Sequence, residues 1–145
     1  MASKPDIQLA SDLRTVVARL IKKLRKESVT GRQLSLTERS SMSLLLQHKE
    51  LLPSELASME KITNQSMSQV LNHLLELGYI NRKASETDKR KVIISLSESG
   101  ERTLLQVRAE RDEWLSKAIS ETCSEEEVSA LKQAIGPLTK LVDFE

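Results

Sequence analysis

The spacing of apolar residues predicts a mainly helical chain. Between residues 7 and 27, leucine, isoleucine, valine and alanine recur at steps of three and four, which is the period of an α-helix with one apolar stripe. Similar stripes predict helices at about 64–77, 98–121 and 125–142, a leucine-rich run predicts one at about 37–47, and Pro53 suits the first position of a short helix at 53–61. Hydroxyl side chains suited to N-caps precede four of them: Thr37, Thr63, Ser97 and Ser124. Pro137 is expected to kink or end the last helix.

Two short segments have the alternating pattern of β-strands. Apolar Ile80 precedes polar Asn81, and the segment 92–96 alternates in the same way. They flank a charged stretch of several residues, so we expect an antiparallel hairpin. The predicted order is four helices, two strands and two helices. The short helix at 53–61, the tight connection at Lys61 and Ile62, and the helix after Thr63 together predict a helix-turn-helix.

Composition limits the class of protein. The 145 residues fit one domain, 1–145, of ordinary soluble composition. Aromatic residues make up only 2%, which argues against a single-strand nucleic-acid binder that stacks bases on aromatic rings. The single cysteine, Cys123, fits a reducing compartment, and neither a signal peptide nor a membrane-spanning run is visible. We therefore expect a cytoplasmic protein without a membrane partner.

Charge is segregated along the chain, although the net charge is only +1. Residues 14–32 contain seven lysines and arginines against one acid, and residues 82–91 contain five against two. Residues 110–127 contain seven acids against two bases. A polyanionic partner is therefore indicated by local clusters and not by the overall charge.

One face of the predicted helix after Thr63 is polar but almost uncharged. Apolar residues occupy one side, and the opposite side and its flank hold amides and hydroxyls, at Gln65, Ser66, Ser68, Gln69 and Asn72. Such side chains can hydrogen-bond to base edges in the major groove of DNA. A solvated helix face more usually contains lysine and glutamate. We favour base recognition over the solvated-face interpretation.

The predicted hairpin tip is rich in cations. Lys89, Arg90 and Lys91 are placed to contact phosphates or an adjacent minor groove, whose negative potential attracts arginine. The alternative is a charged tip that prevents edge-to-edge strand pairing, for which one charge would suffice. Asp88 is expected to shape the turn and orient Arg90.

Taken together, these segments resemble the MarR family of bacterial winged-helix transcriptional regulators. The stretches ITNQSMSQVLNHLLELGYINRK and DKRKVIISLSESG are similar to the recognition helix and the wing of that family. The wing signature is present as Asp88, Arg90, an apolar strand, Leu96, Ser97 and Gly100. PSELASM and LTERSSMSLLL are similar to the two preceding helices, although Leu52 and Ser97 stand where threonine is common.

The resemblance implies a winged helix-turn-helix lobe at 36–100 and dimerisation helices at 7–35 and 101–145. A two-fold dimer would also explain the apolar stripes of the long terminal helices, which one small lobe cannot bury. The resemblance implies double-stranded DNA as the partner and a pseudo-palindromic operator, with repression by promoter occlusion. It assigns base contacts to the first half of the recognition helix and Arg90 to the minor groove and phosphates. Arg82 and Lys89 are candidates for backbone contacts.

Relatives in that family often bind a small anionic or aromatic effector between the dimerisation helices and the lobe. Arg14 and Arg19, on the basic face of the first helix, are the candidates here, together with Lys22 and Arg25. The competing interpretation is a solvated face, or one paired with the acidic segment of a second subunit. Cys123 is expected to be a packing residue, because neighbouring carboxylates disfavour the thiolate.

Other classes of function are less compatible with the sequence. There is no glycine-rich phosphate loop, nucleophile elbow or metal-ligand pair, so we expect neither an enzyme nor a cofactor or metal site. The remaining alternative is a winged-helix module that binds another protein, since a fold alone does not specify function. Such a module would expose apolar anchors on the helix after Thr63 and not amides.

Overall fold

The computed structural model describes residues 4–145; residues 1–3 of the expected 1–145 domain lie outside the described part. Its fold is a winged helix-turn-helix with additional long helices, as the sequence predicts. The elements are α1 (Ile7–Glu27), a short 3₁₀ turn η1 (Thr30–Gln33), α2 (Leu36–His48), α3 (Pro53–Glu60), α4 (Asn64–Glu76), β1 (Ile80–Ala84), β2 (Val92–Leu96), α5 (Glu98–Thr122) and α6 (Glu125–Val142).

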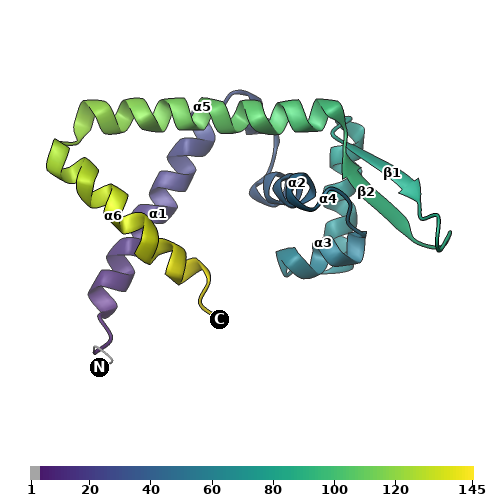
Figure 1. The fold of residues 1–145 in the computed structure, drawn as a ribbon, viewed down its shortest axis with the longest axis horizontal. Helices are drawn as coiled ribbons and strands as arrows, with labels where there is room; N and C mark the ends of the chain where they lie inside the picture. The colour runs from purple at the N-terminus through teal and green to yellow at the C-terminus, as the bar shows by residue number, and fades with distance from the viewer. Residues whose placement is uncertain (1–3) are drawn as a thin grey trace.

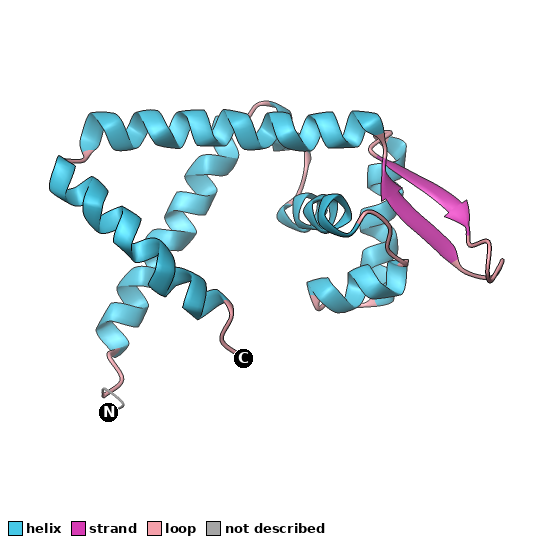
Figure 2. Cartoon of the chain, viewed as in Figure 1, coloured by secondary structure: helices cyan, strands magenta, loops and turns pink. Residues whose placement is uncertain are grey.

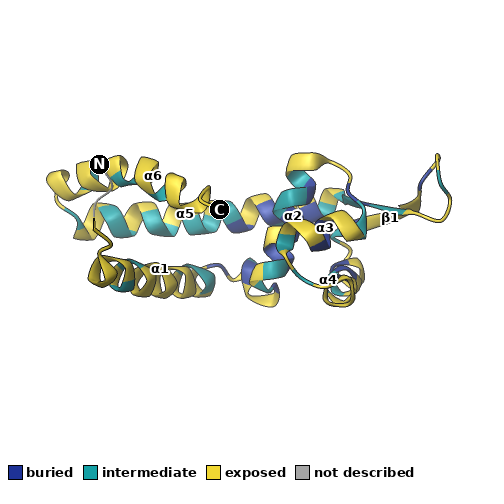
Figure 3. Cartoon of the chain, turned by 90° about the horizontal axis from the view of Figure 1, so that it is seen from below, coloured by how far each residue is buried: buried dark blue, intermediate teal, exposed yellow. Residues whose placement is uncertain are grey.

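Helix α5 connects the two halves of the molecule. Figure 1 shows it as a long rod, with α2, α3, α4 and the hairpin at its first half and α1 and α6 at its second half. The hairpin projects from the compact half as the only sheet drawn in Figure 2. Figure 3 shows α1 and α6 on opposite sides of α5. The chain therefore consists of a compact lobe and an open arrangement of three long helices.

Burial is concentrated in the compact lobe (Figure 3). The core cluster extends from Leu34 to Leu104 and includes Met42, Leu56 and Met67 at 0% exposure. No residue of α1 or α6 is buried, although both helices have apolar stripes. Apolar side chains on these two helices and after them are strongly exposed, among them Ile7, Val16, Ile135, Val142 and Phe144.

The helix starts follow the predicted capping residues with one correction. Thr63, Ser97 and Ser124 accept hydrogen bonds from the first turns of α4, α5 and α6, as expected. The N-cap of α2 is Ser35 and not Thr37, because Ser35 and Glu38 form a reciprocal capping box. Thr37 lies inside the first turn of that helix.

Pro137 does not end α6, which continues to Val142. The pyrrolidine nitrogen cannot donate to the carbonyl four residues earlier, so one intrahelical hydrogen bond is missing. In the following turn, the Thr139 hydroxyl donates to the carbonyl of Ile135 at 2.8 Å. Of the two outcomes expected for Pro137, a kink or an end of the helix, the second does not occur.

The hairpin has the predicted antiparallel register, with Ile80 opposite Leu96 and Ala84 opposite Val92. Leu51, in the α2–α3 connection, adds a bridge to the other edge of β2 through two backbone hydrogen bonds with Ile94, at 3.0 and 2.8 Å. These bonds attach the base of the hairpin to the helical lobe, so that its tip extends from a fixed support.

Candidate nucleic-acid interface

Helix α4 is held against the lobe by one apolar face. Met67, Leu71 and Leu74 are buried at 0–6% exposure, which fixes the side of α4 that faces the core. The Thr63 hydroxyl accepts from the Ser66 backbone N–H at 3.0 Å and completes the first turn. The tight connection from α3 is made by Lys61 in the left-handed conformation, with φ of 57°.

The opposite face of α4 is accessible along its whole length. All five predicted contact residues are exposed: Gln65, Ser66, Ser68, Gln69 and Asn72. The two serine hydroxyls bond locally, that of Ser66 with Thr63 and that of Ser68 with the Asn64 carbonyl. Within residues 4–145 the side-chain amides at 65, 69 and 72 make no hydrogen bond. Their donors and acceptors are therefore available to an external partner.

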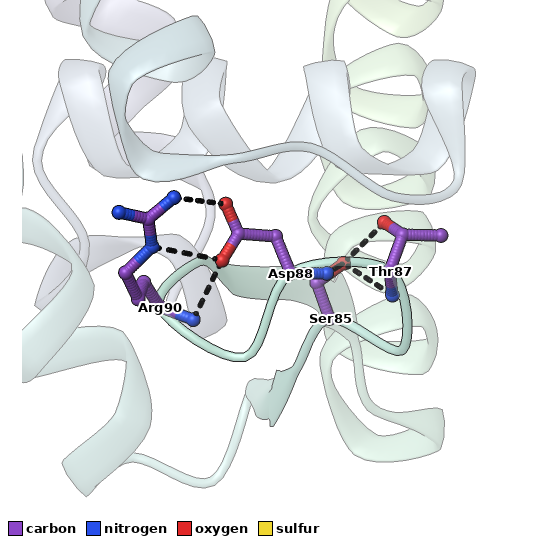
Figure 4. Close-up of polar contacts among 4 residues, drawn as sticks. All are labelled: Ser85, Thr87, Asp88 and Arg90. Atoms are coloured by element: carbon purple, nitrogen blue, oxygen red, sulfur yellow. Dashed lines mark hydrogen bonds and ion pairs between the residues drawn. The ribbon is translucent and has the colours of Figure 1, made fainter.

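The segment between the strands forms an ordered turn around Asp88. The Asp88 carboxylate accepts from the Arg90 backbone N–H at 3.1 Å and from its guanidinium at 3.2 and 3.3 Å (Figure 4). These hydrogen bonds from Arg90 hold the pKa of Asp88 below its usual value. At the start of the turn, the Ser85 hydroxyl accepts from the backbone N–H groups of Thr87 and Asp88. Asp88 thus shapes the turn and orients Arg90, as expected.

The cations of the turn point into solvent. The Arg90 side chain is 91% exposed, and Lys89 and Lys91 are exposed beside it. Arg82 lies exposed on β1, opposite Ile94. Their neighbour Lys83 is engaged within the chain, since its Nζ lies 3.0 Å from a carboxylate oxygen of Glu50.

The predicted effector residues lie elsewhere. Arg14 and Arg19 are exposed on α1, and Figure 1 shows α1 at the end of the molecule opposite the hairpin. A groove of about 350 Å³ opens further along the same helix and is lined by Lys22, Arg25, Lys26 and Arg32. Of the four basic candidates on this face, Lys22 and Arg25 line the groove, whereas Arg14 and Arg19 do not.

A buried cation, Arg39, was not identified from the sequence. Arg39 is 4% exposed, and three guanidinium nitrogens have no hydrogen-bond partner in the described chain. Burial lowers its pKa, and the charges of Arg111 and Arg25 lower it further. No pattern in the sequence distinguishes Arg39 from an exposed arginine, because its burial depends on how α2 packs near α1 and α5.

The cysteine, possible metal ligands and possible membrane-spanning helices were also compared with the structure. Cys123 is a free, partly exposed thiol at the end of α5. No cluster of three or more potential metal ligands occurs among residues 4–145. None of the helices in the same range is both long and apolar enough to cross a membrane.

Comparison with known proteins agrees with this geometry. The MarR family model matches residues 34–92, which include the helix-turn-helix and most of the hairpin. An uncharacterised HTH-type transcriptional regulator of Mycobacterium bovis is 33% identical over 138 residues, covering 95% of both chains.

Two solved structures share the whole architecture. A Pseudomonas aeruginosa PA01 protein described as a transcriptional regulator has a TM-score of 0.81 and 33% identity, covering 99% of this chain and 100% of that one. A MarR family protein from Bacillus stearothermophilus has a TM-score of 0.78 at 22% identity, covers 95% of each chain, and supports the fold alone. The chain therefore belongs to the MarR family of winged helix-turn-helix transcriptional regulators.

Proposed function

We propose that this regulator binds a pseudo-palindromic operator as a homodimer and represses transcription by occluding a promoter. The observation that carries the proposal is the combination of three unpartnered amides on α4 with the exposed cations of the turn between β1 and β2. Amides discriminate base edges in the major groove, whereas cations bind phosphates and the minor groove. A partner protein would require exposed apolar anchors on α4. Between Gln65 and Asn72 every exposed residue of α4 is polar, and the apolar residues are buried or half-buried.

In this proposal, base contacts come from the exposed face of α4: Gln65, Ser66, Ser68, Gln69 and Asn72. Arg90 contacts the minor groove and flanking phosphates, while Arg82, Lys89 and Lys91 contact the backbone. Asp88 acts indirectly, because it holds the turn that presents Arg90.

Gln69 lies in the middle of the exposed face and provides the sharpest test of base recognition. We expect Gln69→Ala to weaken binding to the selected operator by about 1–3 kcal/mol, the usual effect of losing a bidentate base contact. Binding to random DNA should change little, since phosphate contacts are unaffected. Titration of both duplexes at one salt concentration measures the two affinities. An equal loss on both would place Gln69 at the DNA backbone.

The proposed dimerisation helices are α1, α5 and α6, within residues 7–35 and 101–145. Leu9, Val16, Ile135 and Leu141 are each at least 58% exposed in the single chain. A groove of about 420 Å³ between α5 and α6 is lined mainly by apolar side chains, including Leu115, Ile119, Val128 and Leu131. Exposed apolar area of this extent favours association with a second copy.

We therefore expect the protein to sediment with twice the mass of one chain at micromolar concentration. Ile135→Glu should shift it toward the monomer, because the substitution places a charge in the apolar contact. Sedimentation velocity over a range of concentrations measures both species. A well-folded wild-type monomer would contradict the dimer and the two-fold operator together.

We propose that an anionic effector binds on the basic face of α1, where Arg14 and Arg19 are exposed, and that the groove lined by Lys22 and Arg25 gives it access toward the buried Arg39. A buried guanidinium without acceptors is unfavourable, so an anion that reaches it gains a charge-assisted interaction. Arg25 both lines the groove and acts on the charge of Arg39.

Benzoate, a small aromatic anion, tests this site. At ten times its dissociation constant it should stabilise the wild-type protein by about 1.4 kcal/mol. Arg39→Met should abolish this gain, and it should itself raise the unfolding midpoint because it removes an uncompensated buried charge. Thermal unfolding at constant ionic strength measures both effects. Equal benzoate stabilisation of the two proteins would contradict the placement.

A further inference from the structure

Glu38 is a carboxylate buried near the start of α2. Its side chain is 8% exposed. Oε1 accepts from the Ser35 backbone N–H at 2.7 Å, and the Ser35 hydroxyl accepts from the Glu38 N–H at 3.1 Å. Oε1 thus completes the capping box of α2, and Oε2 has no part in it.

The second carboxylate oxygen of Glu38 makes a contact with helix α4. Oε2 of Glu38 pairs with Nδ1 of His73, which lies 35 residues later, in α4. His73 follows Gln69 by four residues, so the two side chains are stacked along the same edge of the helix. The imidazole is 44% exposed, between the core-facing side and the exposed amide face.

The surroundings of Glu38 keep its carboxylate charged. Burial alone would raise the pKa of Glu38, but the hydrogen bond from the Ser35 backbone and the contact with His73 hold that pKa below its usual value. The carboxylate is therefore ionised at neutral pH. A buried charge that loses a partner is unfavourable, which makes the His73 contact directional and persistent.

The remaining contacts of α4 with the core do not have this directionality. Met67, Leu71 and Leu74 bury apolar surface, and such packing tolerates a small rotation of a helix about its axis better than a hydrogen bond does. The Glu38–His73 contact is thus the polar link between the side of α4 and the rest of the lobe in the described chain.

We infer that Glu38 and His73 are positioning residues for DNA recognition: their contact fixes the rotation of α4 and thereby aims Gln69 and its neighbours at the base edges. The inference rests on the proposed function, because it assigns α4 to base recognition. Neither residue needs to contact DNA in this role.

Four proteins test the inference: His73→Ala, Glu38→Gln, the double variant, and His48→Ala as a control. Glu38→Gln keeps an acceptor for the Ser35 N–H and removes the charge, so the capping box is retained. His48 is an exposed histidine at the end of α2. Hydrogen exchange of the α4 amides is measured in the free proteins, and affinities are measured for the selected operator and for random DNA.

We expect His73→Ala to accelerate exchange in α4 and to weaken operator binding on the order of tenfold, with random-DNA binding unchanged. The double variant should bind no worse than His73→Ala, since Glu38→Gln acts on operator binding only through the contact that His73→Ala has already removed. His48→Ala should behave as wild type in both measurements.

Unchanged exchange in α4 would overturn the inference. Equal losses on operator and random DNA would also overturn it, because they would indicate general destabilisation. If the wild-type protein selects no DNA sequence, the proposed function fails; faster α4 exchange in His73→Ala would then still support the anchoring of α4 by Glu38.

Discussion

Arg90→Ala is expected to weaken DNA binding more than any other single substitution in the turn. Each hydrogen bond to a charged group contributes about 1.5–3 kcal/mol, and a dimer loses the contact twice. The predicted loss is therefore about 10²-fold or more. The side chain is 91% exposed and is held by Asp88, so its removal leaves the core intact.

The salt dependence provides a second readout for Arg90. Every phosphate contact contributes about 0.9 to the slope of log affinity against log salt, so two lost contacts should make the slope shallower by about 1.8. Fluorescence anisotropy at several salt concentrations measures affinity and slope together. Lys140→Ala, which removes an exposed cation from α6, is the control. Wild-type affinity and slope in Arg90→Ala would exclude the turn from the interface.

Gly100→Ala is expected to have the largest effect on stability. A Cβ at this position would lie 2.0 Å from the carbonyl oxygen of Tyr79. That oxygen belongs to the backbone at the entry to β1 and also accepts from the Ser97 N–H at 3.0 Å, so it cannot move aside freely. The free energy of unfolding should fall by at least the roughly 1–3 kcal/mol typical of overpacking.

Gly136→Ala is the matched control for Gly100→Ala. It lies in α6, and a Cβ there would meet no atom within 4 Å. Its higher helix propensity should stabilise the protein by about 0.5–1 kcal/mol. Urea unfolding measures both variants, and equal stabilities would show that the approach of Tyr79 to α5 is looser than the structure indicates.

Local sequence patterns were sufficient for most of the fold. Apolar periodicity located the long helices, Pro53 indicated the short α3, and alternation located both strands, whereas the 3₁₀ turn η1 was not predicted. The N-cap of α2 was misplaced because Ser35 and Thr37 both precede the apolar run; the spacing of Ser35 and Glu38 is the signal that distinguishes them. The helix at 125–142 was predicted with the correct bounds, and Pro137 does not end it because an exposed helix can tolerate one missing hydrogen bond.

The candidate interface was predictable only in part. Exposure of the α4 amides and the role of Asp88 followed from helical spacing and turn chemistry. The Glu38–His73 contact and the burial of Arg39 did not, because each depends on how separate helices pack. Charged and polar residues are normally exposed, and a sequence gives no sign of the few that are not.

The measurement that tests the central claim most directly is selection of bound duplexes from a random DNA pool at two salt concentrations. The account predicts enrichment of one pseudo-palindrome whose half-sites lie about 10 base pairs apart, the spacing set by one turn of DNA. Salt-sensitive binding without enrichment would contradict base recognition by α4, and absence of binding at both salt concentrations would contradict the DNA-binding interface as a whole.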